Sequence, residues 1–211
     1  AEMAITYPLS LPSSPTFRTS AWTPRSSVGV SESPWSFAQQ TQVHGGRRWE
    51  VSVELPPMLR ADAAEWQAFL LKLNGRQGTF LLGDPAATAL RGAGGGTPVV
   101  AGANAVGATS LNVRGLADVV SVWLAGDFIS VGSGINTRLH MVLGTVNGNV
   151  GSPSGEAAVD IWPSLRAALS DGAAIAVASC KGTFRLADNA MPWTIDEMRV
   201  YGFSFNAVEA L

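Results

Sequence analysis

The sequence predicts a mainly β protein with one α-helix, in which a small β-barrel is inserted between two strands of a larger β-domain. The first indication is an octapeptide that occurs twice, as GTFLLGDP at residues 78–85 and GTFRLADN at residues 182–189. Both copies fit a short strand that runs into a turn, because Asp followed by Pro or Asn stops a strand. The second indication is the different composition of residues 86–181, and the third is a single helical pattern.

These observations divide the chain into a discontinuous β-domain, residues 1–85 and 182–211, and an inserted barrel, residues 86–181. Within the insert, residues 86–107 are nearly all Ala, Gly, Thr and Val, so we expect a flexible linker there. The alternative is that the two octapeptides are unrelated amphipathic strands that are similar by chance.

Composition excludes several classes of protein. The 211 residues are 46% hydrophobic and 14% charged, which is unlike a disordered tail. A net charge of −2 without any block of Lys and Arg offers no electrostatic surface for nucleic acid or anionic membrane. The one cysteine, Cys180, cannot form an intrachain disulfide, and we expect it to be a buried side chain. We find neither a secretory signal pattern nor an apolar run of membrane-spanning length.

The N-terminal region is expected to be extended. Residues 1–31 carry bulky side chains set singly among Pro, Ser and Thr, which favours an edge segment along a surface or a neighbouring subunit. The alternative is a loose terminal arm. A hairpin follows, with one strand at residues 35–43, a tight turn at residues 44–46 (His-Gly-Gly) and a second strand at residues 49–55. The second strand alternates apolar and polar residues, so one face of the hairpin is expected to be buried.

Next comes the helical pattern. Asp62 and Glu65 have the spacing of a capping box, and Asn74-Gly75 is a stop signal. The apolar residues between them recur at i, i+3, i+4 and i+7, which puts them on one buried helical face: Trp66, Phe69, Leu70 and Leu73.

The insert contains six strand-like runs, at residues 109–113, 120–124, 128–131, 138–143, 157–161 and 173–178. Turn signals separate them at residues 125–127, 133–134, 147–149 and 171–172. So many short strands over so short a length favour a small closed or nearly closed barrel. After the second octapeptide, residues 199–209 alternate aromatic and small side chains and are expected to pair with residues 49–55.

No catalytic, cofactor or metal site is expected. Two histidines, His44 and His140, and one thiol cannot supply an ordinary His/Cys metal site. Most of the candidate carboxylates fall in or next to turns, where Asp is common for local reasons; they are Asp84, Asp127, Asp160, Asp171 and Asp188. No nucleophile-elbow motif is present. A binding or structural role is therefore favoured over catalysis.

Longer stretches show a family resemblance. The β-domain carries WEVSVELP, AEWQAFLLKLNGRQGTFLLGDP, GTFRL and YGFSFNAVEAL, and the insert carries AGDFISVG, RLHMV and GEAAVDIWPSLR. In this order, over nearly the whole chain, they resemble the distal tail proteins of long non-contractile-tailed bacteriophages and related prophage tail proteins.

The resemblance implies a tube-type β-sandwich domain with an inserted OB-like barrel. It also implies a ring of six copies in the virion, made in the host cytoplasm, that joins the tail tube to the tip or baseplate hub. DNA would pass through the ring unread, without membrane insertion, and the barrel would face outward to support fibres or receptor-binding proteins.

Two features depart from this pattern. The glycine-rich stretch 92–107 is long for a strand connection, which suggests a loosely tethered insert, and no adhesion motif is visible. The alternative function is a carbohydrate-binding β-domain, an adhesin or accessory module, with Trp123 and Trp162 as stacking residues. Both tryptophans also suit a barrel core, and an enzyme ranks third.

Overall fold

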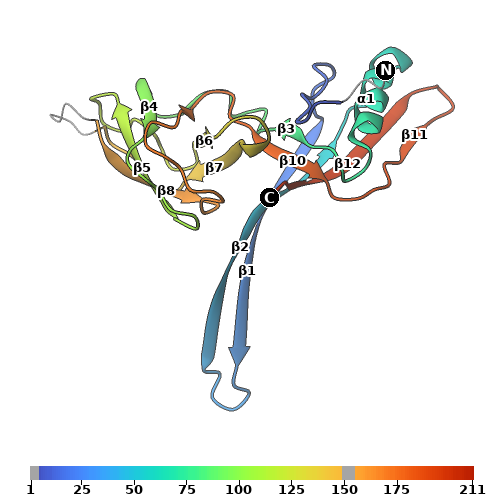
Figure 1. Cartoon of the computed structure of the whole chain (residues 1–211). Coiled ribbons are helices and arrows are strands. Elements are labelled where there is room, and N and C mark those ends of the chain that lie inside the picture. The colour runs from blue at the N-terminus through green and yellow to red at the C-terminus, as the bar shows by residue number, and fades with distance from the viewer. Residues whose placement is uncertain (1–4, 149–154) are drawn as a thin grey trace.

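Two antiparallel six-stranded sheets make up the protein, shown here by a computed structural model that describes residues 5–148 and 155–211 (Figure 1). The first, here called the arm sheet, has the order β1 (Thr19–Glu32), β2 (Gln39–Glu54), β12 (Tyr201–Glu209), β10 (Gly182–Leu186), β3 (Phe80–Leu82), with β11 (Trp193–Ile195) beside β12. The second, the barrel sheet, has the order β4 (Gly96–Val100), β5 (Ser110–Leu116), β8 (Ala157–Trp162), β7 (Arg138–Val142), β6 (Phe128–Val131), β9 (Ile175–Ala176). One α-helix, α1 (Arg60–Leu73), and one short 3₁₀ helix, η1 (Gly134–Asn136), complete the described part.

The mainly β fold with one α-helix is therefore confirmed. Strands from both ends of the chain share the arm sheet, whereas every strand of the barrel sheet comes from residues 96–176. A bridge between Val99 and Ala174 connects β4 with the segment that leads into β9, which brings the barrel sheet close to closure.

The two octapeptide copies lie next to each other. β3 pairs antiparallel with β10, so that Phe80 of the first copy lies opposite Phe184 of the second, and both side chains are fully buried. At the small position of the first copy, a Cβ on Gly83 would come within 2.0 Å of the carbonyl oxygen of Cys180. Only glycine allows the chain to leave β3 this close to the backbone that returns from the barrel.

α1 covers the arm sheet through the predicted apolar face. Trp66, Phe69, Leu70 and Leu73 are all buried. Phe69 packs edge-on against Phe80 of β3, with ring centroids 5.6 Å apart, and Phe80 packs in the same way against Phe205 of β12. The helix thus packs its aromatic residues on β3 and β12.

The helix ends as predicted but begins differently. Asn74 adopts the left-handed conformation at the C-terminal end, with φ 49° and ψ 55°, in agreement with the stop signal. The N-cap is Leu59, without a side-chain hydrogen bond, so the predicted capping box is wrong. Asp62 lies instead in the first turn, where a negative charge interacts favourably with the helix dipole.

The N-terminal segment follows the free edge of the arm sheet, as expected of an edge segment. The Leu9 amide donates to the carbonyl of Thr79, and the Leu81 amide donates to the carbonyl of Leu9. The Tyr7 hydroxyl donates to the carbonyl of Lys72, at the end of α1. The edge of β3 is thereby covered by the chain itself.

The predicted position of the hairpin turn is wrong. β1 and β2 pair from Thr19 with Glu54 to Glu32 with Gln39, so residues 44–46 lie inside β2 and the reversal falls at residues 33–38. There, the Ser33 amide donates to Ala38 and the Phe37 amide donates to Ser33. Gly45 and Gly46 stay extended because residues 26–28 lie opposite them, across a bulge in the ribbon. The expected pairing of residues 49–55 with the C-terminal strand is confirmed, with Val53 opposite Phe205.

Two predictions for the barrel are also wrong. Residues 120–124 form no strand, only a bridge between Trp123 and Val146, because the Asp127 carboxylate accepts backbone hydrogen bonds from Arg91, Gly92 and Leu124 and curls the segment. The expected linker 86–107 contains β4, which pairs with β5. Of the predicted turn at residues 147–149, Asn149 lies outside the described residues.

The barrel packs firmly on the arm sheet, which corrects the expectation of a loose tether. Trp162 of β8 packs edge-on against Trp49 of β2 with ring centroids 4.4 Å apart, and the Trp49 indole donates to the Leu139 carbonyl of β7 at 3.1 Å. The Thr183 amide of β10 donates to the Thr137 carbonyl. These contacts form a continuous junction between the two sheets.

Replacing Trp66 with Ala should lower the free energy of unfolding by about 3–5 kcal/mol, because it leaves a cavity under α1 that its neighbours cannot fill. Trp35→Ala serves as the matched control: the Trp35 side chain is 91% exposed, so its loss should change stability by less than about 0.5 kcal/mol. Urea denaturation followed by circular dichroism measures both. Equal losses in the two variants would contradict the assigned core.

Candidate interaction surface

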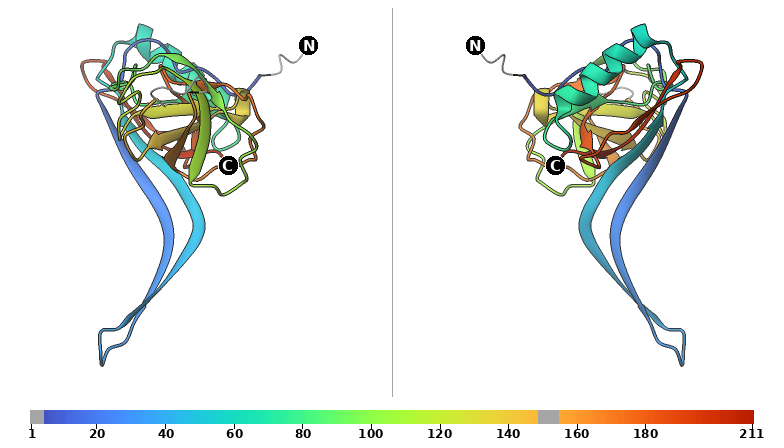
Figure 2. Two further views of the ribbon diagram at one scale, coloured as in Figure 1. Left: turned by 90° about the vertical axis from the view of Figure 1, so that its left-hand side faces the viewer. Right: turned by 90° about the vertical axis from the view of Figure 1, so that its right-hand side faces the viewer.

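The most prominent feature of the molecule is a projecting arm, defined as residues 25–48. β2 pairs with β12 only over Glu50–Glu54, so beyond this point β1 and β2 have no other neighbour. Figure 1 and Figure 2 show the ribbon extending well away from both sheets. None of its residues is buried. A two-stranded ribbon is only marginally stable alone, so the arm depends on the buried base of β2 for its shape.

The arm exposes large apolar side chains. Trp35 and Phe37, in the reversal at its tip, are 91% and 73% exposed. Along the ribbon, Val28, Val30 and Val43 are exposed as well, and Val28 lies directly opposite Val43. Exposed aromatic residues grouped at the end of a projection are typical of a surface that contacts another molecule.

Charges hold the base of the arm. Arg48 donates to the Glu50 carboxylate at 2.6 Å, and Arg25 from the opposite strand lies 3.4 Å from it. The hydrogen bond from Arg48, followed by the positive charge of Arg25, lowers the pKa of Glu50 below its usual value. The group is partly exposed, so it orients the two strands more than it stabilises them.

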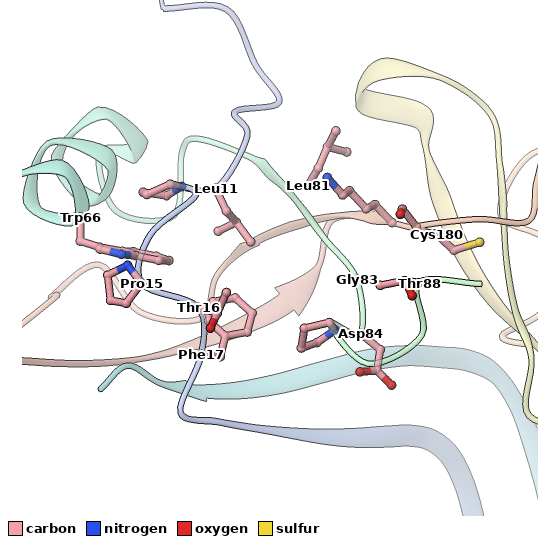
Figure 3. A pocket seen from close by; sticks show the side chains of 14 residues that line it. Leu11, Pro15, Thr16, Phe17, Trp66, Leu81, Gly83, Asp84, Thr88 and Cys180 are labelled. Carbon is pink, nitrogen blue, oxygen red and sulfur yellow. The ribbon is translucent and has the colours of Figure 1, made fainter. Parts of the chain in front are cut away.

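A second feature is an apolar cavity of about 260 Å³ beneath the N-terminal segment (Figure 3). Leu11 and Phe17 border it from the N-terminal segment, and Trp66 borders it from α1. Leu81 of β3 and Cys180, just before β10, complete this part of the wall. The fully buried Trp66 indole N–H has no hydrogen-bond partner. The cavity wall is mainly apolar, with Asp84 and Lys181 as its charged members.

The two candidate sugar-stacking residues do not form an open platform. Trp123 is fully buried in the barrel core, which confirms the competing core role. Trp162 packs against Trp49 at the junction of the sheets. The carbohydrate-binding alternative therefore has no exposed aromatic pair from these residues.

The candidate carboxylates are dispersed. Asp127 is engaged by backbone amides, Asp171 pairs with Arg114, and Asp84 accepts from the Ala86 amide in its own turn. Within the described ranges, no three His, Cys, Asp or Glu side chains come close enough to hold a metal ion.

His140 and Cys180 are both buried, and each is hydrogen-bonded to a different backbone carbonyl. Nδ1 of His140 lies 2.8 Å from the Pro163 carbonyl, to which it donates. Burial lowers the pKa of His140 to about 4, so the ring is neutral near pH 7. The Cys180 thiol donates to the Phe128 carbonyl at 3.1 Å, and burial raises its pKa, which disfavours the thiolate.

Sequence reasoning missed the arm. Apart from Trp35 and Phe37, its residues are mainly polar with scattered valines, and the His-Gly-Gly signal suggested a turn where the strand continues. One signal could have located it. Two long strand-compatible runs flank the step Ser33-Pro34, and a Ser-Pro step favours a reversal of the chain.

No family model matches the chain, and a search of curated proteins finds no match. In the described part of the chain, no helix is long and apolar enough to cross a membrane.

The buried His140 predicts an acid-sensitive fold. The unfolded state takes up a proton near pH 6.5 and the native state only near pH 4, so stability is complete above pH 6.5 and is lost as the pH falls toward 4. Between pH 7 and 4.5 the loss is roughly 2–3 kcal/mol.

The measurement is urea unfolding of the wild type and His140→Gln across this pH range. Glu209, whose pKa burial raises, contributes in the opposite direction in both proteins and cancels in the difference. The variant should lose less stability on acidification. Identical pH profiles would contradict a neutral buried His140.

Proposed function

We infer that this chain is a structural protein of a bacteriophage tail tip, whose copies form a ring between the tail tube and the tip or baseplate machinery. The observation that carries the inference is the arm, which exposes Trp35 and Phe37 on a ribbon that its own chain cannot cover. The family resemblance supplies the virion setting and the expected number of six copies.

The shape of the molecule favours contact between unlike surfaces. Figure 1 shows the arm extending from one side, with α1 and β11 at the opposite end. That end also exposes large apolar side chains, namely Leu59, Leu71, Ile195 and Met198. A contact between the arm of one copy and a different surface of the next is heterologous, and such contacts form a ring when the rotation between copies closes.

Composition supports the passage of DNA without binding. The net charge of −2, with few cations in any one region, provides little counterion release for a phosphate backbone. The barrel, attached at the side of the arm sheet by the Trp49–Trp162 junction, is the part available for fibres or receptor-binding proteins.

The test is light scattering of the purified chain over a concentration series, with negative-stain images of the largest species. The wild type should form closed rings of six, on its own or on addition of tail tube protein. Trp35→Ser with Phe37→Ser should shift assembly to concentrations at least about tenfold higher, because aromatic anchors dominate interface energies.

Val120→Ser is the control, since Val120 is also exposed but lies on the barrel. It should assemble like the wild type. A chain that remains monomeric even with tail tube protein present would exclude the ring, and rings unaffected by the double substitution would exclude the arm as the contact.

A further inference from the structure

The barrel contains a further cavity, of about 250 Å³. It lies between the end of β6, η1 and the loop that follows β8. Arg138 and His140 of β7 and Arg166 of the loop give it polar groups. The rest of the wall is mainly small or apolar, including Val131, Leu165, Ala167, Ala168 and Leu169.

Arg166 is the unusual member of this cavity. Its Nε and Nη2 atoms are buried, yet neither has a hydrogen-bond partner. A guanidinium withdrawn from water without acceptors is costly, and natural proteins nearly always provide a partner for such a group. Arg166 therefore has two buried N–H donors that no acceptor occupies.

Arg138 adds a second positive charge. Its Nη1 donates to the carbonyls of Ile135 and Thr137, at 3.2 and 3.4 Å, which holds the side chain in place. Among the described residues, no carboxylate forms an ion pair with either Arg138 or Arg166. The two guanidinium groups thus lack the anionic partner that usually accompanies them.

One carboxyl group, Glu209 of β12, lies within electrostatic range of both arginines. Its Oε2 accepts the Trp49 amide at 3.3 Å, and its Oε1 is buried without a partner. As a single carboxyl facing two guanidinium groups, it offsets the two cations only in part. The local charge remains positive in a chain that is slightly acidic overall.

His140 contributes a neutral polar group. Because Nδ1 donates to the Pro163 carbonyl, Nε2 of the neutral ring is left as an acceptor. A ligand with both an anionic group and a hydroxyl would match this combination of guanidinium donors and an imidazole acceptor.

We propose that this cavity binds a compact anionic ligand, one carboxylate or phosphate group on a body the size of a single sugar. Guanidinium groups hold such oxyanions with paired, charge-assisted hydrogen bonds, and the apolar wall contacts the body of the ligand. A cavity of about 250 Å³ is below the usual range for drug-sized ligands, so a single residue of a polymer or a free monomer fits. The proposal does not depend on ring formation.

The experiment is isothermal titration calorimetry of the whole chain with sodium glucuronate, inorganic phosphate and uncharged glucose as probes. Glucuronate or phosphate should bind and glucose should not, and the relative affinities of the two anions distinguish a carboxylate source from a phosphate source. Binding should weaken as salt increases. Arg166→Gln and Arg138→Gln should each weaken it about tenfold or more.

Arg114→Gln is the matched control, because Arg114 is another barrel arginine but pairs with Asp171 at the surface. It should bind like the wild type. Glu209→Gln should bind the anion more tightly, since it removes the one carboxyl that competes for the arginines while it keeps an acceptor for the Trp49 amide. Circular dichroism verifies that each variant is folded.

Absence of binding by both anions would overturn the proposal, as would equal binding of glucose. Anion binding that survives Arg166→Gln, or that Arg114→Gln weakens equally, would overturn it as well.

Discussion

The pairing of β3 with β10 is the interaction on which the rest of the structure depends. It places Phe80, which packs against α1, opposite Phe184. It also holds the two points where the chain leaves and re-enters the arm sheet on neighbouring strands. Gly83 passes so close to the Cys180 carbonyl that no side chain fits between them. Because closing a long loop costs little more entropy than closing a short one, a whole barrel can be accommodated at this point.

This close crossing also determines where the barrel sits. Because its two ends are held together, the barrel must begin next to the arm sheet. The aromatic contact between Trp49 and Trp162 then fixes the orientation of the barrel relative to β2. The Trp49 indole, hydrogen-bonded to the Leu139 carbonyl, adds direction to what would otherwise be a nonspecific apolar contact. The same strand, β2, thereby anchors both the barrel and the arm.

The arm and the barrel cavity present two different kinds of unsatisfied chemistry. The arm leaves aromatic surface at Trp35 and Phe37 in water, which favours contact with another protein surface. The cavity leaves the guanidinium of Arg166 without acceptors, which favours a small anion. Elsewhere in the barrel, Asp127 shows the usual outcome, a buried charge fully engaged by backbone amides. The contrast identifies Arg166 as an exception within one small domain.

The sequence by itself determined the fold class, the α1 face of Trp66, Phe69 and Leu73, and the strands whose alternation is regular, because periodicity and turn chemistry are local properties. It placed the hairpin turn at residues 44–46 and a linker over β4 because glycine favours turns only where no partner strand keeps the chain extended. The arm, the Trp49–Trp162 junction and the cluster of Arg138, Arg166 and Glu209 were decided only by the tertiary structure. Each of these features joins residues far apart in the chain. A local sequence pattern does not specify which distant strand, aromatic ring or charged group a residue will contact.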